Sequence, residues 1–381
     1  MFEPGKFLKR ALQIVWHYKV LWIFGFLIVL TGGASGSGGG SGGGGGTGAQ
    51  WRTDQPFHYR GVDGFGQFSP QMQQVEDWAA ENVAPLFATE AKAIATTFII
   101  FGIIFAIALV FGLLAALVRY PAETAVMRMV DAHEQTGTKL RFKEGWRMGW
   151  NRRAWRIFLV DLLIGTPAFG IFLLLVGGLG AYFFANRENP EAALNVGVGI
   201  WIVVVVMLLL ALALLMVVVS LVRQFIIRKA AFEELGVWDS FRQGWAMFKL
   251  NWKHAALMWL IMIGVGIGVG IATFIAVFIL IPAYLILAIP GVIAAAIPGA
   301  IGYGITSLFA GEVLPWIIAT FLALPVFFIV VFSPLFLISG AYTVYGSTVW
   351  TLFYRDKISR EELPVSLPLP EQTPPPVITQ K

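Results

Sequence analysis

The 381-residue sequence has no cysteine, only four histidines and few charged residues. Without cysteine it forms no disulfide, no thiolate metal site and no cysteine nucleophile. The histidines belong to no metal-ligand or hydrolase motif, so the sequence predicts no cofactor and no enzyme activity. Charged residues make up 13% of the chain, against about 25% in soluble domains. That is too little polar surface to solvate a globule of this length.

Apolar residues are instead abundant, at 57% of the chain. A helix needs about 20 consecutive apolar residues to cross a bilayer. Five runs meet this length: 93–118, 157–184, 197–222, 255–281 and 316–340. The sequence therefore predicts an all-α membrane protein.

A sixth span is predicted near the N-terminus, where the clean apolar run from Val20 to Leu30 is short. It reaches across a bilayer only if the helix begins near Ala11. The alternative interpretation is a secretory signal peptide, with residues 33–35 as the cleavage site.

A short stretch rich in Trp and basic residues precedes an apolar run three times, beginning at Phe7, Phe142 and Phe241. The second and third copies share a Phe-x-x-Gly-Trp pattern, in 142–146 and 241–245. Repetition of this kind predicts six transmembrane helices arranged as three pseudo-repeated units, each an amphipathic helix followed by a hairpin.

The positive charges are unevenly distributed between alternate loops. Of the 27 Lys and Arg residues, 23 lie in the segments 1–19, 119–156, 223–253 and 355–381. By the positive-inside rule, both termini are expected in the cytoplasm of a bacterial cell with the protein in its inner membrane. A nucleic-acid partner is not expected, because the basic residues lie at helix ends rather than in one solvated domain.

The predicted organisation has four parts. They are a cytoplasmic start and first span (1–31), an external Gly-rich tether and amphipathic helix (32–92), a five-span core (93–353) and a Pro-rich cytoplasmic tail (354–381).

Two basic, Trp-rich segments, 141–156 and 239–253, are the predicted lipid-contacting sites. An interfacial helix of this composition suits an anionic leaflet, although ordinary anchoring by an aromatic belt explains it as well. The candidate headgroup contacts are Arg147, Arg152, Arg153, Arg156, Arg242 and Lys253.

Asp161 is the one acidic residue within an apolar run, and it is the candidate intramembrane polar site. Such a residue marks a transport path or forms an ion pair. Pairing with Arg156 or with a neighbouring helix is the preferred interpretation.

The apolar stretch 282–315 is interrupted by prolines and glycines, including Pro290 and Pro298. This composition is typical of re-entrant half-helices that line a substrate pathway. Just before it, Gly264 with Gly268 and Gly266 with Gly270 form GxxxG pairs that predict close helix contact.

Together with the three copies and the Phe-x-x-Gly-Trp repeats, the segment Ser347–Arg355 resembles a group of bacterial six-span integral membrane proteins. That group is similar to the membrane domain attached to some glycerophosphodiester phosphodiesterases. The resemblance implies an accessory membrane module, and it transfers no functional residue.

The predicted function is a non-enzymatic membrane scaffold or lipid-interacting accessory protein. Its expected partners are membrane lipids and other membrane proteins. The alternative is a small-molecule or lipid transporter that uses 282–315.

Overall fold

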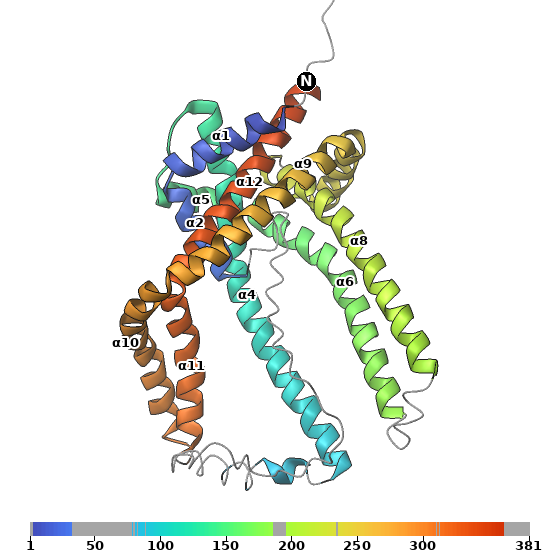
Figure 1. The fold of residues 1–381 in the computed structure, drawn as a ribbon, viewed down its shortest axis with the longest axis vertical. Helices are drawn as coiled ribbons and strands as arrows, with labels where there is room; N and C mark the ends of the chain where they lie inside the picture. Colours follow the sequence, from blue (N-terminus) through green and yellow to red (C-terminus); the bar gives the residue numbers. More distant parts are fainter. Residues whose placement is uncertain are drawn as a thin grey trace, which may run out of the picture.

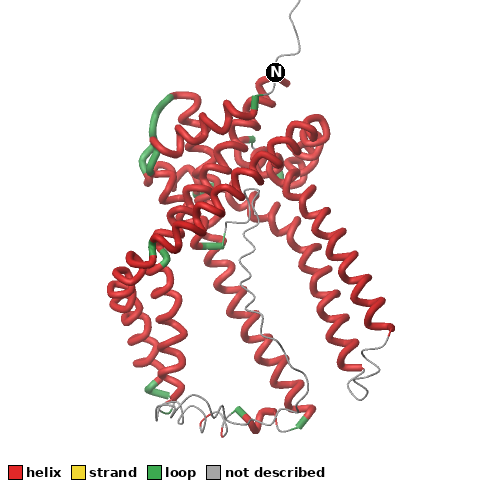
Figure 2. Tube along the Cα trace, in the orientation of Figure 1, coloured by secondary structure: helices red, strands yellow, loops and turns green. Residues whose placement is uncertain are grey.

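The computed structural model describes residues 3–32, 78, 81, 83–87, 89–185, 196–233, 235–309, 311 and 313–361. Within this part the chain forms helices and no strands (Figure 2). The all-α prediction is confirmed.

The helices differ greatly in length. In chain order they are α1 (Pro4–His17), α2 (Val20–Leu30), the 3₁₀ helix η2 (Ala84–Phe87), α4 (Glu90–Thr136), α5 (Phe142–Gly149), α6 (Arg152–Ala185), α8 (Val196–Phe232), α9 (Val237–Ile279), α10 (Ile281–Thr306), α11 (Val313–Val331) and α12 (Ser333–Glu361). Six of those described are long and apolar enough to cross a membrane: Ala95–Thr136, Arg152–Leu175, Val203–Phe232, Val237–Ile279, Ile281–Thr306 and Val313–Val331.

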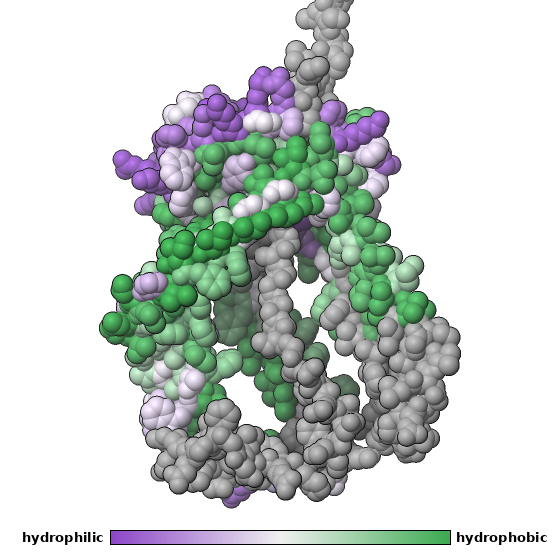
Figure 3. All heavy atoms as spheres, in the orientation of Figure 1, coloured by the Kyte–Doolittle hydropathy of each residue, from purple (hydrophilic) through white to green (hydrophobic). Residues whose placement is uncertain are grey.

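The molecule has a polar end, which we call the head, and apolar arms that extend from it (Figures 1 and 3). The head comprises α1, α2, α5, the ends of α4, α8 and α12, and the starts of α6 and α9. The arms are the first part of α4, the α6–α8 pair and the α10–α11 pair. A membrane protein of several spans has this division between solvated and lipid-facing surface.

The core lies in the head. One cluster joins α1, α2, α4, α8, α9 and α12, and a second joins α4, α6 and α8. Trp350, Phe353 and Tyr354 of α12 are at most 1% exposed. The segment Ser347–Arg355, which carries the resemblance to the six-span membrane proteins, therefore packs at the centre of the head.

The arms show the opposite pattern. From Phe98 to Leu114, every side chain of α4 is exposed, Phe98 by 73%. At about 25 cal/mol per Å² of apolar surface, leaving such a helix in water is unfavourable. Its surface is suited to lipid.

The N-terminal helix does not run on from Ala11 as the first-span prediction requires. It ends at His17, and α2 starts at Val20 with its axis bent by 98°. The bend between α1 and α2 is stabilised by the Trp22 indole, which donates a hydrogen bond to the Val15 carbonyl (2.8 Å). The 11 residues of α2 extend about 16 Å, half of a bilayer core.

The stretch 282–315 is also different from the prediction, because Pro290 and Pro298 lie inside the continuous helix α10. The breaks are instead at Leu280 and after Thr306. Helices in lipid tolerate proline when neighbouring groups satisfy the freed carbonyls. The run 316–340 is likewise divided, since α11 ends at Val331 and α12 begins at Ser333.

The GxxxG prediction is wrong for most of its glycines. A Cβ at Gly264, Gly268 or Gly270 would meet nothing within 4 Å. A close backbone approach is instead made by Gly25 of α2 and Gly340 of α12, where a Cβ on Gly25 would collide with the Gly340 carbonyl and one on Gly340 would lie 2.6 Å from the Phe26 nitrogen.

Most of the predicted external segment 32–92, including its Gly-rich tether, lies outside the described residues, as does the chain beyond Glu361. The C-terminal tail was predicted to begin at residue 354. In the structure α12 continues to Glu361.

Candidate functional site

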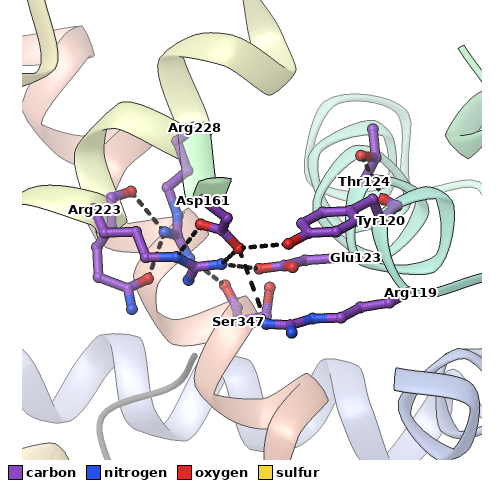
Figure 4. A network of polar contacts seen from close by, with 9 residues as sticks. Arg119, Tyr120, Glu123, Thr124, Asp161, Arg223, Arg228 and Ser347 are labelled. Carbon is purple, nitrogen blue, oxygen red and sulfur yellow. Dashed lines mark hydrogen bonds and ion pairs between the residues drawn. The ribbon is translucent and has the colours of Figure 1, made fainter. Parts of the chain in front are cut away.

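Asp161 of α6 lies at a junction of four helices (Figure 4). Tyr120 and Glu123 come from α4, Arg223 and Arg228 from α8, and Ser347 from α12. These polar residues lie where the arms enter the head. We call this group, with Arg119 and Gln224, the ion network.

Arg223 is the centre of the ion network. Its Nε and Nη2 donate to Asp161 Oδ1 and Oδ2, at 2.6 and 2.7 Å. Nη2 also lies 3.5 Å from Glu123 Oε1. The side chains are only 11% exposed for Arg223 and 14% for each acid. Bidentate pairs in such surroundings are among the stronger polar contacts in proteins.

The α4 helix supplies two further contacts to Asp161. The Tyr120 hydroxyl donates to Oδ2 at 3.2 Å, and Arg119 Nη2 lies 3.9 Å from the same oxygen. Asp161 therefore connects α6 to both α4 and α8.

Arg228 is 1% exposed, and the acceptors of its hydrogen bonds within the described part of the chain are neutral oxygens. Nη1 donates to the carbonyl and side-chain oxygens of Gln224, and Nη2 to the Ser347 carbonyl at 3.1 Å. It thereby links α8 to α12.

The central charges of the ion network are paired. Its acids are held by arginines, and among the described residues no three His, Cys, Asp or Glu side chains are grouped to hold a metal. A reacting site needs a nucleophile or base beside space for a substrate. The geometry suits a structural clamp between helices.

Sequence reasoning preferred an ion pair for Asp161, with Arg156 or with a neighbouring helix, and the partner is on a neighbouring helix. Arg156 instead donates to the Leu235 carbonyl (2.8 Å). In the sequence, the partner Arg223 counts only among the positive charges of the segment 223–253. Its place one residue past the run 197–222 was the available clue.

The predicted headgroup residues divide into two groups. Arg147, Arg152, Arg242 and Lys253 are exposed. Arg153 and Arg156 are half-buried and donate to the carbonyls of Ala231 and Leu235.

Exposed tryptophans accompany the exposed basic residues. Their exposed fractions run from 38% to 70%: Trp16, Trp150, Trp155, Trp238, Trp245 and Trp252. Lys249 and Lys253 lie over the rings of Trp245 and Trp252. We call these tryptophans, with the four exposed basic residues above, the basic aromatic rim. Its residues lie on or beside α1, α5 and the first parts of α6 and α9, which Figure 1 shows in the head.

Two glycines lie where helices that carry the basic aromatic rim contact other helices of the head. A Cβ on Gly244 of α9 would lie 2.7 Å from Ile226 Cγ1 of α8, and one on Gly145 of α5 would collide with Met129 of α4. These are the glycines of the two Phe-x-x-Gly-Trp copies. Each therefore permits close approach to the helix that precedes it in the chain.

Comparison with known proteins gives a family but no activity. No curated protein matches the sequence, and no solved structure matches it. A family of unknown function, DUF7544, matches residues 16–352, which include every residue of the ion network. The chain belongs to this family.

Proposed function

We propose that this protein is a non-enzymatic, multi-pass scaffold of the bacterial inner membrane, whose head binds the anionic cytoplasmic leaflet. The observation that carries the proposal is the basic aromatic rim. Tryptophan prefers the membrane interface, and each basic residue near an anionic surface adds about 1 kcal/mol of attraction. Placing both on the head gives the protein a surface for lipid headgroups.

Both termini on one side would require six passes: five are α4, α6, α8, α9 with α10, and α11 with α12, and the first begins with α2, which covers only half of a bilayer core. In Figure 1, α9 leads away from the head into α10, and α11 leads back into α12. The bends at Leu280 and Phe332 would then lie within two single passes. The distribution of Lys and Arg favours the head as the cytoplasmic end.

Three pseudo-repeated units are supported by equivalent contacts. The amphipathic helix α5 packs on α4, and the start of α9 packs on α8. The first amphipathic helix, α1, packs on α12. Each of the three amphipathic helices would then pack on a long helix of the head. Helix breaks at Asn151 and Asn251 follow the second and third copies, nine residues after Phe142 and ten residues after Phe241.

A scaffold role agrees with the resemblance to the membrane module of some glycerophosphodiester phosphodiesterases. It also agrees with the separated arms, whose exposed apolar faces offer surface to lipids or to helices of other membrane proteins.

The test uses the full chain in nanodiscs. Exchanging phosphatidylcholine for phosphatidylglycerol should raise its melting temperature, and this gain should shrink in the double variant Arg152→Gln/Lys253→Gln. Lys92→Gln is the control, since Lys92 lies at the far end of α4. Equal gains in the double variant and in the wild type would leave only the anchoring interpretation of the rim.

A lipid transporter is the second candidate. It is favoured by an apolar groove of about 680 Å³ between α10 and α11, lined by Gly299, Tyr303, Trp316 and Thr320 among others. Its lining carries no charged residue. Such a groove suits an acyl chain better than a polar solute.

A further inference from the structure

The apolar groove between α10 and α11 has the shape of a site for one hydrocarbon chain. Its volume of about 680 Å³ is within the range of small-molecule sites. Its lining runs along α10 from Val292 to Tyr303 and along α11 from Trp316 to Phe327. Each of these stretches extends about 16 Å at 1.5 Å per residue. We call this space the hairpin groove.

Aromatic rings close both ends of the hairpin groove. At the end away from the head, the ring centroids of Tyr303 and Trp316 lie 4.9 Å apart and connect the two helices. At the other end the Phe327 ring lies against α10, where a Cβ on Gly291 would be 3.2 Å from it. Between the rings the lining is chiefly alanine: Ala295, Ala296, Ala300, Ala319 and Ala323. These side chains are too small to fill the space between the two aromatic ends.

The helices touch beneath the groove and separate above it. Gly299 is buried, and a Cβ there would lie 3.3 Å from the Ala323 Cβ of α11. Ala296, Ala300 and Thr320 are exposed, so the groove opens to the surroundings of the arm. Atoms that line an unfilled space lose their van der Waals contacts on one side. A molecule from the surroundings that fills the groove restores those contacts.

The length of the hairpin groove matches one leaflet, because a bilayer core is about 30 Å thick. Tryptophan and tyrosine prefer the membrane interface, which places the Tyr303 end at the headgroups and the Phe327 end near the midplane. An acyl chain of a phospholipid runs in this direction through this distance. A transmembrane helix crosses the whole core and would meet the Phe327 ring halfway, so the groove suits a chain better than a helix.

We propose that the hairpin groove holds one acyl chain of a glycerophospholipid from the leaflet away from the head. The ester groups of this lipid would lie beside Tyr303 and Trp316, whose hydroxyl and indole N–H can donate hydrogen bonds. The inference rests on the proposed membrane placement of the arms, and it names the ligand of the lipid-transporter candidate. It requires no transport and no lipid at the basic aromatic rim.

The experiment uses the full chain in phosphatidylcholine nanodiscs that contain a trace of phosphatidylcholine with a diazirine in one acyl chain. After photolysis, mass spectrometry of peptides locates the adducts. The adducts should concentrate on 292–303 and 316–327. The reference is the exposed apolar stretch 203–210 of α8, which lies in an arm without belonging to the groove. Equal labelling of the groove and of this stretch overturns the proposal.

The double variant Ala296→Phe/Ala300→Phe fills the hairpin groove from exposed positions. Labelling of α11 should fall about tenfold, because the added rings occupy the space of the chain. Ala272→Phe is the matched control, since Ala272 is exposed on α9 outside the groove, and it should label as the wild type does. If the double variant does not fold, Thr320→Phe fills the groove from α11, and the labelling of α10 is measured. Unchanged labelling in the groove variant overturns the proposal.

Two further outcomes also overturn the proposal. Dissociation of a dimer by the groove variant, but not by Ala272→Phe, would indicate that a helix of a second copy occupies the groove. Absence of labelling on every arm would contradict the membrane placement itself. Failure of the rim proposal would appear separately, as no preference for phosphatidylglycerol, because the labelling uses neutral lipid throughout.

Discussion

Arg223 of α8 donates two hydrogen bonds to Asp161 of α6, at 2.6 and 2.7 Å, although 62 positions separate the two residues in the chain. The pair is mostly buried within the network of polar contacts in Figure 4. A lone acid in an apolar helix costs several kcal/mol in lipid. Pairing with Arg223 removes most of that penalty and fixes α6 beside α8.

Asp161→Asn should therefore destabilise the protein. The amide remains nearly isosteric, but it leaves Arg223 with only the 3.5 Å contact to Glu123 as charge compensation. We expect the free energy of unfolding to fall by about 1–3 kcal/mol. Titration with a denaturing detergent in mixed micelles measures this change.

Asp239→Asn is the matched control, since Asp239 is exposed at the start of α9. It should unfold at nearly the wild-type midpoint. An unchanged midpoint for Asp161→Asn would instead mean that Asp161 is not a structural ion-pair partner, and would favour a transport role.

The contact between Gly25 and Gly340 gives a second prediction. A methyl group at Gly25 would collide with the Gly340 carbonyl, which is backbone and cannot rotate away. We expect Gly25→Ala to lower the free energy of unfolding by about 1–3 kcal/mol.

Gly264→Ala is the comparison, because Gly264 is also helical and a Cβ there meets nothing within 4 Å. It should be neutral or stabilise by up to about 1 kcal/mol. Equal effects of the two substitutions would argue against close packing of α2 on α12.

The apolar runs predicted the helices well, because uninterrupted hydrophobic stretches leave few alternatives to a membrane helix. They predicted the helix ends poorly. Residues 119–136 of α4 carry charges at its polar end, yet they continue the helix and bury Val126 and Met129 in the head. Local hydropathy does not register burial against distant helices.

Proline was misleading for a related reason. Pro290 and Pro298 suggested breaks but lie inside α10, whereas Pro282, also among the predicted breaks, stands directly after the actual break at Leu280. The ion network was only half predictable. Asp161 stood out in its run, but its partner could be identified only once the fold placed α8 beside α6.

Cysteine labelling from outside intact cells tests the six-pass account most directly, since the native chain has no cysteine and gives no background. Ser307→Cys, in the exposed turn after α10, should react with an impermeant thiol reagent, and Thr138→Cys, in the exposed turn after α4, should not. If α9 and α10 were two separate spans, the turn after α10 would face the cytoplasm. Labelling of Thr138→Cys from outside, or of Ser307→Cys only after permeabilisation, would contradict the account.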